Sequence, residues 1–150
     1  MSMQTDVVYG YGFYVYVSDE ELKNFILKHK DTIFKLDRGR EVLEYTKRCS
    51  DDEFNPKEDF YDLSCDTNGN QGFYSIIANT MSAETGIRFD YCRAQEDDND
   101  AILFAEGYPW HLNKIEMTLT EEKLEEICKK YITDLGGQLK PEHIRLEYFG

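Results

Sequence analysis

The sequence predicts a single α+β domain, residues 1–150, with a mixed or mostly antiparallel sheet of four to five strands and helices packed on it. Three observations support this prediction. The length of 150 residues is that of one domain. Hydrophobic residues make up 41% of the chain, enough for a core. Segments with strand periodicity and segments with helix periodicity share the chain, without internal repeats or a low-complexity linker.

The first expected strand, Val7–Val17, is rich in β-branched and aromatic residues. Both of its faces are largely apolar, which predicts a central strand covered on both sides. Gly10 and Gly12 fall on the same face and leave a flat spot that another element can approach closely.

Two helices are expected next. Ser18 and Glu21 form a capping-box pattern that marks the start of the first. An apolar stripe at helical spacing follows, made of Leu22, Phe25, Ile26 and His29. The second runs from about Arg40 to Arg48, with Gly39 at the turn before it.

Two further helices are expected in the second half of the chain. One has Phe73, Ile76, Ile77 and Thr80 at helical spacing and ends near Gly86. The last begins after Thr120 as N-cap, and Gly136 is placed as its C′ residue. Its apolar stripe comprises Leu124, Ile127, Cys128 and Tyr131.

The remaining strands are expected late in the chain. Residues 87–93 and 101–106 predict a hairpin whose connection, Gln95–Asp100, is acidic. Residues 115–119 suggest a further short strand, and His143–Phe149 a final one. A helical turn is also expected near Glu58–Leu63, within a long acidic loop.

The net charge of −13 is concentrated in the middle of the chain. Residues 51–106 contain fourteen acidic and three basic residues, a net of −11, whereas residues 1–50 sum to zero. A negative field of this kind repels nucleic-acid phosphates and attracts basic proteins. Direct nucleic-acid binding is therefore disfavoured, and a basic partner is expected.

The predicted partner-binding residues are the carboxylates of three short acidic runs, which are interleaved with Phe54, Phe60 and Tyr61. Such carboxylates can imitate the charge of nucleic-acid phosphates, and the aromatics add contact area. The same groups can equally form a solvated surface, with the aromatics as anchors to the core. The residues are Asp51, Asp52, Glu53, Glu58, Asp59, Asp62, Glu96, Asp97, Asp98 and Asp100.

No catalytic, metal or cofactor site is predicted. The glycines of Gly10-x-Gly12 lie inside a strand, unlike a phosphate loop. Asp66–Asn70 begins like a calcium loop, but Gln71 replaces the required glycine and Ile77 the bidentate glutamate. The cysteines have no metal or redox spacing and are expected to be reduced, at positions 49, 65, 92 and 128. The sequence pairs none of them with His29, His111 or His143.

The start of the chain has no signal-peptide pattern, and nowhere is an apolar run long enough to span a membrane. We therefore expect a cytoplasmic protein that does not bind membranes.

In its size, its pI near 4.6 and its localised acidity, the chain resembles the small acidic proteins that bacteriophages and mobile elements encode against host defence. These include anti-CRISPR and anti-restriction inhibitors, many of which block the nucleic-acid channel of a nuclease. The resemblance is one of type, rests on no motif and assigns no functional residue. It implies a non-enzymatic inhibitor that engages a basic, nucleic-acid-binding protein.

Two alternatives remain open at the level of sequence. A small carboxylate- or metal-dependent enzyme could use the loop 51–70, in which case its carboxylates would be clustered and buried. An accessory domain could use its acidity only for solubility, and it would then tolerate neutralisation of these charges.

Overall fold

The computed structural model describes residues 5–50, 52–54, 75–93, 100–105 and 112–149. Within them, five α-helices and a four-stranded antiparallel sheet confirm the predicted α+β class. In chain order the elements are β1 (Thr5–Tyr14), α1 (Asp19–Lys28), α2 (Lys30–Phe34), α3 (Gly39–Arg48), α6 (Ser75–Thr85), β2 (Asp90–Arg93), β3 (Asp100–Ala105), the 3₁₀ helix η2 (Glu116–Thr118), α7 (Glu121–Asp134) and β4 (Glu142–Phe149).

The sheet has the order β2-β3-β1-β4, so β1 is central, as its two apolar faces predicted. Residues 10–14 of β1 pair with β3, and residues 5–12 pair with β4. The two neighbours of the first strand therefore come from the second half of the chain.

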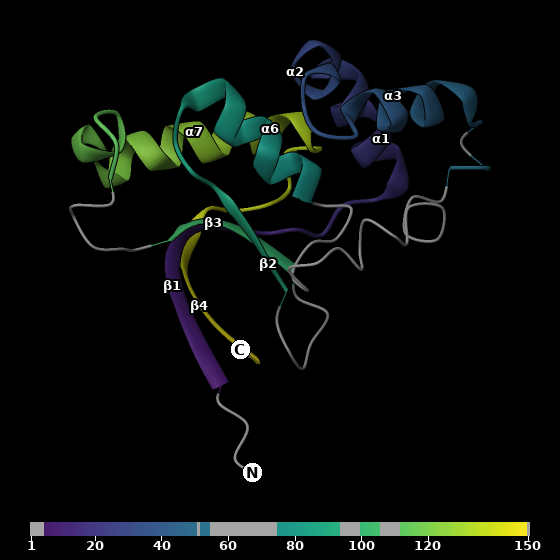
Figure 1. Ribbon diagram of the computed structural model, residues 1–150. Helices are drawn as coiled ribbons and strands as arrows, with labels where there is room; N and C mark the ends of the chain where they lie inside the picture. Colours follow the sequence, from purple (N-terminus) through teal and green to yellow (C-terminus); the bar gives the residue numbers. More distant parts are fainter. Residues whose placement is uncertain (1–4, 51, 55–74, 94–99, 106–111, 150) are drawn as a thin grey trace.

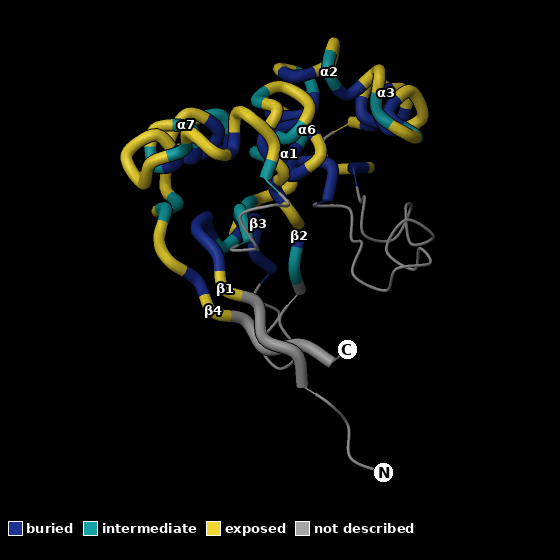
Figure 2. Tube along the Cα trace, turned by 60° about the vertical axis from the view of Figure 1, so that its left-hand side comes forward, coloured by how far each residue is buried: buried dark blue, intermediate teal, exposed yellow. Residues whose placement is uncertain are grey.

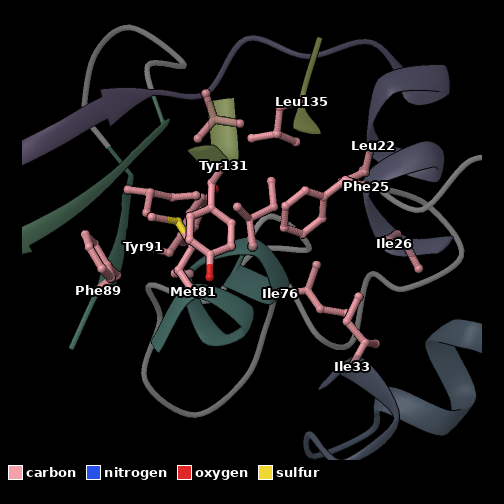
Figure 3. Close-up of a cluster of buried hydrophobic side chains, with 14 of the residues drawn as sticks. Leu22, Phe25, Ile26, Ile33, Ile76, Met81, Phe89, Tyr91, Tyr131 and Leu135 are labelled. Atoms are coloured by element: carbon pink, nitrogen blue, oxygen red, sulfur yellow. The ribbon is translucent and has the colours of Figure 1, made fainter. Parts of the chain in front are cut away.

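The helices form a layer over one face of the sheet (Figure 1). Phe13 of β1, Val15 just after it and Ile102 of β3 lie in one core with the inward faces of the helices. Figure 2 shows the division along each helix, with buried stretches turned inward and exposed stretches outward. Figure 3 shows the centre of this core, where Tyr131 of α7 lies beside Met81 of α6.

The opposite face of the sheet has a smaller buried cluster, made of Ala101, Leu103 and Ile144. Gly12 lies on this face. A Cβ atom at Gly12 would collide with the Ile102 carbonyl oxygen and lie 2.6 Å from the Leu103 Cα atom. The flat spot predicted from the sequence is thus filled by the backbone of β3.

The local sequence explains where α1 and α7 begin and end. The Glu21 amide donates to the Ser18 hydroxyl (3.1 Å) and the Ser18 amide to the Glu21 carboxylate (3.0 Å), which confirms the capping box. Thr120 caps α7 by accepting from the Lys123 amide (3.2 Å). Gly136, with φ of +101°, follows the C-cap of α7 as predicted.

Two strands have other bounds than predicted, since β1 ends at Tyr14 rather than Val17 and β2 begins at Asp90 rather than Ile87. Two further elements differ in kind. The short helix α2 was not expected, because its five residues are too few to show a helical stripe. The strand expected at residues 115–119 is wrong, since residues 116–118 form η2. The buried Glu116 carboxylate accepts from the backbone amides of Asn113 (3.0 Å) and Arg88 (2.9 Å), and these bonds hold the chain in a turn.

The close approach at Gly12 gives a first prediction. Gly12→Ala should lower the free energy of unfolding by about 2 kcal/mol or more, because the methyl group forces β1 away from the backbone of β3. Urea unfolding followed by circular dichroism measures this loss.

Gly137→Ala is the matched control. Gly137 has a φ of +79° but open space around its Cα atom, so only the backbone strain of about 1 kcal/mol is expected. An equal or smaller loss for Gly12→Ala would show that β1 and β3 do not approach each other as described.

Candidate functional site

The connection between β2 and β3 leaves from one end of the sheet. β2 ends at Arg93 and β3 begins at Asp100, the residue paired with Arg93. The Val15 amide donates to the Asp100 carbonyl oxygen (2.7 Å), just before β1 passes into α1. This end of the sheet is therefore also the end at which the helical layer begins.

The connection between α3 and α6 begins in the helical layer, beside α1. The Lys23 ammonium, in the second turn of α1, donates to the Cys49 carbonyl oxygen (2.9 Å) immediately after α3. Phe54 is buried against Tyr45, with ring centroids 5.7 Å apart. At the other side of this connection, α6 packs on β2 and joins it through residues 86–89. The two elements therefore run in opposite directions, and the start of α6 lies near the end of β2.

These two connections contain most of the excess charge of the protein. Residues 51–74 and 94–99 together hold ten acidic residues and one lysine, a net of −9. The other 120 residues sum to only −4. We call the two segments and their flanking residues, Phe54, Ser75, Arg93 and Asp100, the acidic end.

The predicted partner-binding residues fall into three groups. Asp52 and Glu53 are exposed in the turn before Phe54. Asp100 belongs to β3 rather than to the loop and is only 7% exposed, so we exclude it from the accessible carboxylates. The others lie outside the described residues, namely Asp51, Glu58, Asp59, Asp62, Glu96, Asp97 and Asp98.

A second polar cluster surrounds His29, at the end of α1. Its Nδ1 atom lies 3.0 Å from Glu84 Oε2 of α6, and its Nε2 atom lies 2.8 Å from Asp134 Oδ2 of α7. The Tyr131 hydroxyl donates to Glu84 Oε1 (2.8 Å), and the Lys28 ammonium pairs with Asp134. The cluster links the first helix of the layer to α6 and α7.

Sequence reasoning placed His29 in an apolar stripe but missed its carboxylate partners. These are 55 and 105 residues away, so no local spacing could reveal them. Only the helical position of His29, on the inward face of α1, signalled its burial.

The geometry of this cluster suits structural support. Both ring nitrogens of His29 already face carboxylate oxygens, so neither is available to exchange a proton with a substrate. Partial burial would raise the pKa of Glu84, but hydrogen bonds from Thr32, His29 and Tyr131 outweigh it and lower that pKa. Burial, followed by the hydrogen bond to Glu84, raises the pKa of Tyr131.

Two of the described cysteines, Cys92 and Cys128, are not poised as nucleophiles. Burial, with a contribution from Asp90, raises the pKa of Cys92 to about 11, and burial raises that of Cys128 to about 12. The thiolate, which is the reactive form, is therefore disfavoured at both. Cys65 and His111 lie outside the described residues.

Within the described ranges, no group of three or more histidine, cysteine or acidic residues is arranged to hold a metal ion. The calcium-like stretch at residues 66–70 and the helical turn expected near residues 58–63 fall outside those ranges. None of the helices that the structure describes has the length and apolar character needed to cross a membrane.

Comparison of the chain with protein-family models, with curated proteins and with solved structures found no match.

The hydrogen bonds of Glu84 give a second prediction, for the pH dependence of stability. Because its pKa is lowered on folding, the ionised carboxylate stabilises the protein fully above the unfolded value of about 4.5. This stabilisation is lost as the pH falls through the lower, folded value. Glu84→Gln should cost about 1 kcal/mol at pH 7, and the difference from the parent should shrink below pH 4.5.

Urea unfolding of both proteins between pH 7 and pH 3 tests this expectation. Glu44→Gln is a suitable control, because Glu44 is exposed on α3 and its loss should change stability little at any pH. A difference between Glu84→Gln and the parent that stays constant down to pH 3 would contradict the assignment.

Proposed function

We propose that the protein is a non-enzymatic inhibitor that binds a basic, nucleic-acid-binding protein through the acidic end. This places it with the anti-CRISPR and anti-restriction type of counter-defence protein. The single observation that supports the proposal is the separation of charge, with −9 in two connections, one between β2 and β3 and the other before α6, on a scaffold that is otherwise nearly neutral.

The points of attachment at the end of β2 and the start of α6 matter for the strength of the field. Charges spread evenly over a surface are largely screened from one another beyond about 8 Å at physiological salt. Acidic segments that attach near one another combine their charges toward one partner. A groove that accepts nucleic-acid phosphates has the opposite charge and is the complementary surface.

The composition of the acidic segments also favours a contact surface. Phe60 and Tyr61 interrupt the acidic run of residues 58–62. Aromatic residues are enriched at the centres of protein interfaces, whereas a surface that serves only solubility needs none. The proposal assigns the protein to the cytoplasm, in agreement with the free thiols of Cys49, Cys92 and Cys128.

The test begins with capture of partners from a bacterial lysate at low salt, followed by purification of the captured protein. The purified partner should be basic, should be released by 1 M salt, where the Debye length is about 3 Å, and should be displaced by duplex DNA or RNA. Its own binding to nucleic acid should fall when the acidic protein is added.

Charge reversal then locates the binding surface. Replacing Glu96, Asp97 and Asp98 by lysine should weaken binding to this partner by roughly tenfold or more, or about 1.4 kcal/mol. Titration calorimetry or surface plasmon resonance at two salt concentrations measures the change.

The matched control reverses the same number of charges away from the acidic end. Glu44, Glu122 and Glu126 are exposed on α3 and α7, so their replacement by lysine keeps the net charge of the first variant. Binding should be far less affected in this control. If both variants bind equally well, or if binding is independent of salt, the acidic end is not the binding surface and the proposal fails.

A further inference from the structure

The sheet has a two-stranded arm. β3 pairs with β1 only over residues 10–14, whereas Thr5–Tyr9 of β1 pair solely with Arg145–Phe149 of β4 among the described strands. Figure 1 shows β1 and β4 running together beyond the rest of the sheet, with both chain ends on this side. Two paired strands alone are at best marginally stable in water. A third strand beside the arm would therefore stabilise it.

Among the described strands, none pairs with the outer edge of β4. β4 is the last strand in the order β2-β3-β1-β4, and its eight residues contain no proline, although three of them are charged. Natural edge strands are usually protected by proline, by charged side chains, by bulges or by being short, and in a self-paired β4 the charges can attract each other. The other edge strand, β2, has only four residues and is short in this sense. β4 is twice as long and offers backbone donors and acceptors at every second residue.

The sequence of β4 is complementary to itself in one antiparallel register. When two copies are paired about Leu146, Arg145 of each copy stands opposite Glu147 of the other. The same register places Ile144 opposite Tyr148 and His143 opposite Phe149. Opposite charges and apolar or aromatic pairs are the cross-strand combinations that stabilise a sheet. No pair in this register joins like charges.

We propose that β4 is the interface of a homodimer, in which two copies pair edge to edge and antiparallel about Leu146. The result is a continuous eight-stranded sheet with a two-fold axis, the usual symmetry of a dimer. The arm then lies in the order β1-β4-β4-β1 and has four strands instead of two. The acidic end is attached at the opposite end of β1 from the arm, so the dimer does not depend on the proposed function.

The contact of Arg145 within its own chain is compatible with this role. Its Nε atom donates to the Tyr9 hydroxyl (3.3 Å), and its guanidinium carbon lies 5.9 Å from the centre of the Tyr9 ring. Both residues are exposed, Tyr9 by 53%. The guanidinium thus lies toward β1, and pairing with Glu147 of the second copy would replace its contact with Tyr9.

Analytical ultracentrifugation over a range of concentrations tests the proposal in the full-length chain. The parent should sediment as a dimer in equilibrium with its monomer. R145E places two acidic residues opposite each other, and E147R places two basic residues opposite each other. Each variant should raise the dimer dissociation constant by roughly tenfold or more, because two equivalent pairs change from attraction to repulsion.

Mixing the two variants separates the proposal from a folding defect. In a heterodimer of R145E with E147R, every cross-strand pair again joins opposite charges, so the mixture should recover the dimer in a 1:1 ratio. Circular dichroism of each variant should match that of the parent. A parent that is monomeric at every accessible concentration overturns the proposal. The proposal is also overturned if neither variant affects the dimer, or if the 1:1 mixture stays monomeric.

A crosslink tests the register independently. In a Cys65→Ser background, L146C brings two thiols together across the two-fold axis. Directly opposite residues have Cα atoms about 4.5–5.5 Å apart, within the range of a disulfide. In the control H143C, the two introduced cysteines lie six residues apart along the paired strands, or about 20 Å, and they should not crosslink. Mild oxidation should give a covalent dimer with L146C alone, and equal crosslinking of both variants would refute the register.

Discussion

The pairing of β1 on both of its edges is the constraint on which the rest of the structure depends. One face of this strand contributes Tyr11 and Phe13 to the core beneath the helices, and the other contains the glycines that admit the backbone of β3. The strand also leads directly into α1 through the Ser18 cap, and so fixes where the helical layer begins. A change in the register of β1 would move the core, the layer and the acidic end together.

A polar cluster holds the helices of the layer together. His29, Glu84 and Asp134 come from three different helices and meet where the apolar core reaches the surface. Because Glu84 accepts hydrogen bonds from His29, from Thr32 of α2 and from Tyr131 of α7, the cluster fixes the helices in one arrangement. The acidic end has a different organisation, since its charge belongs to connections between elements and its anchors are apolar or backbone groups. The charge that maintains the fold and most of the excess charge therefore lie in different segments.

The sequence predicted the features that depend on neighbouring residues. Local patterns predict the Ser18–Glu21 capping box, the end of helix α7 just before Gly136 and the central position of β1. Features set by distant partners were missed or mistaken. Residues 116–118 form η2 because the Glu116 carboxylate binds the amide of Arg88, 28 residues earlier. In the candidate site, the acidity could be read from composition, but the burial of Asp100 could not. Asp100 is of the same residue type as Asp97 and Asp98 in the loop before it, so the sequence does not mark where β3 begins.

The position of β1 also determines the order in which the protein can fold during synthesis. Of the strands that the structure describes, β1 is synthesised before the others, yet β3 and β4, its two partners, appear only after residue 100 and after residue 142. Until then, the largely apolar strand has no sheet to join, although α1–α3 can form beside it from local contacts. Between the synthesis of β1 and that of β3 the nascent chain therefore exposes an unpaired strand, which is a risk for aggregation. Synthesis rate and chaperone supply would then influence how much native protein a cell obtains.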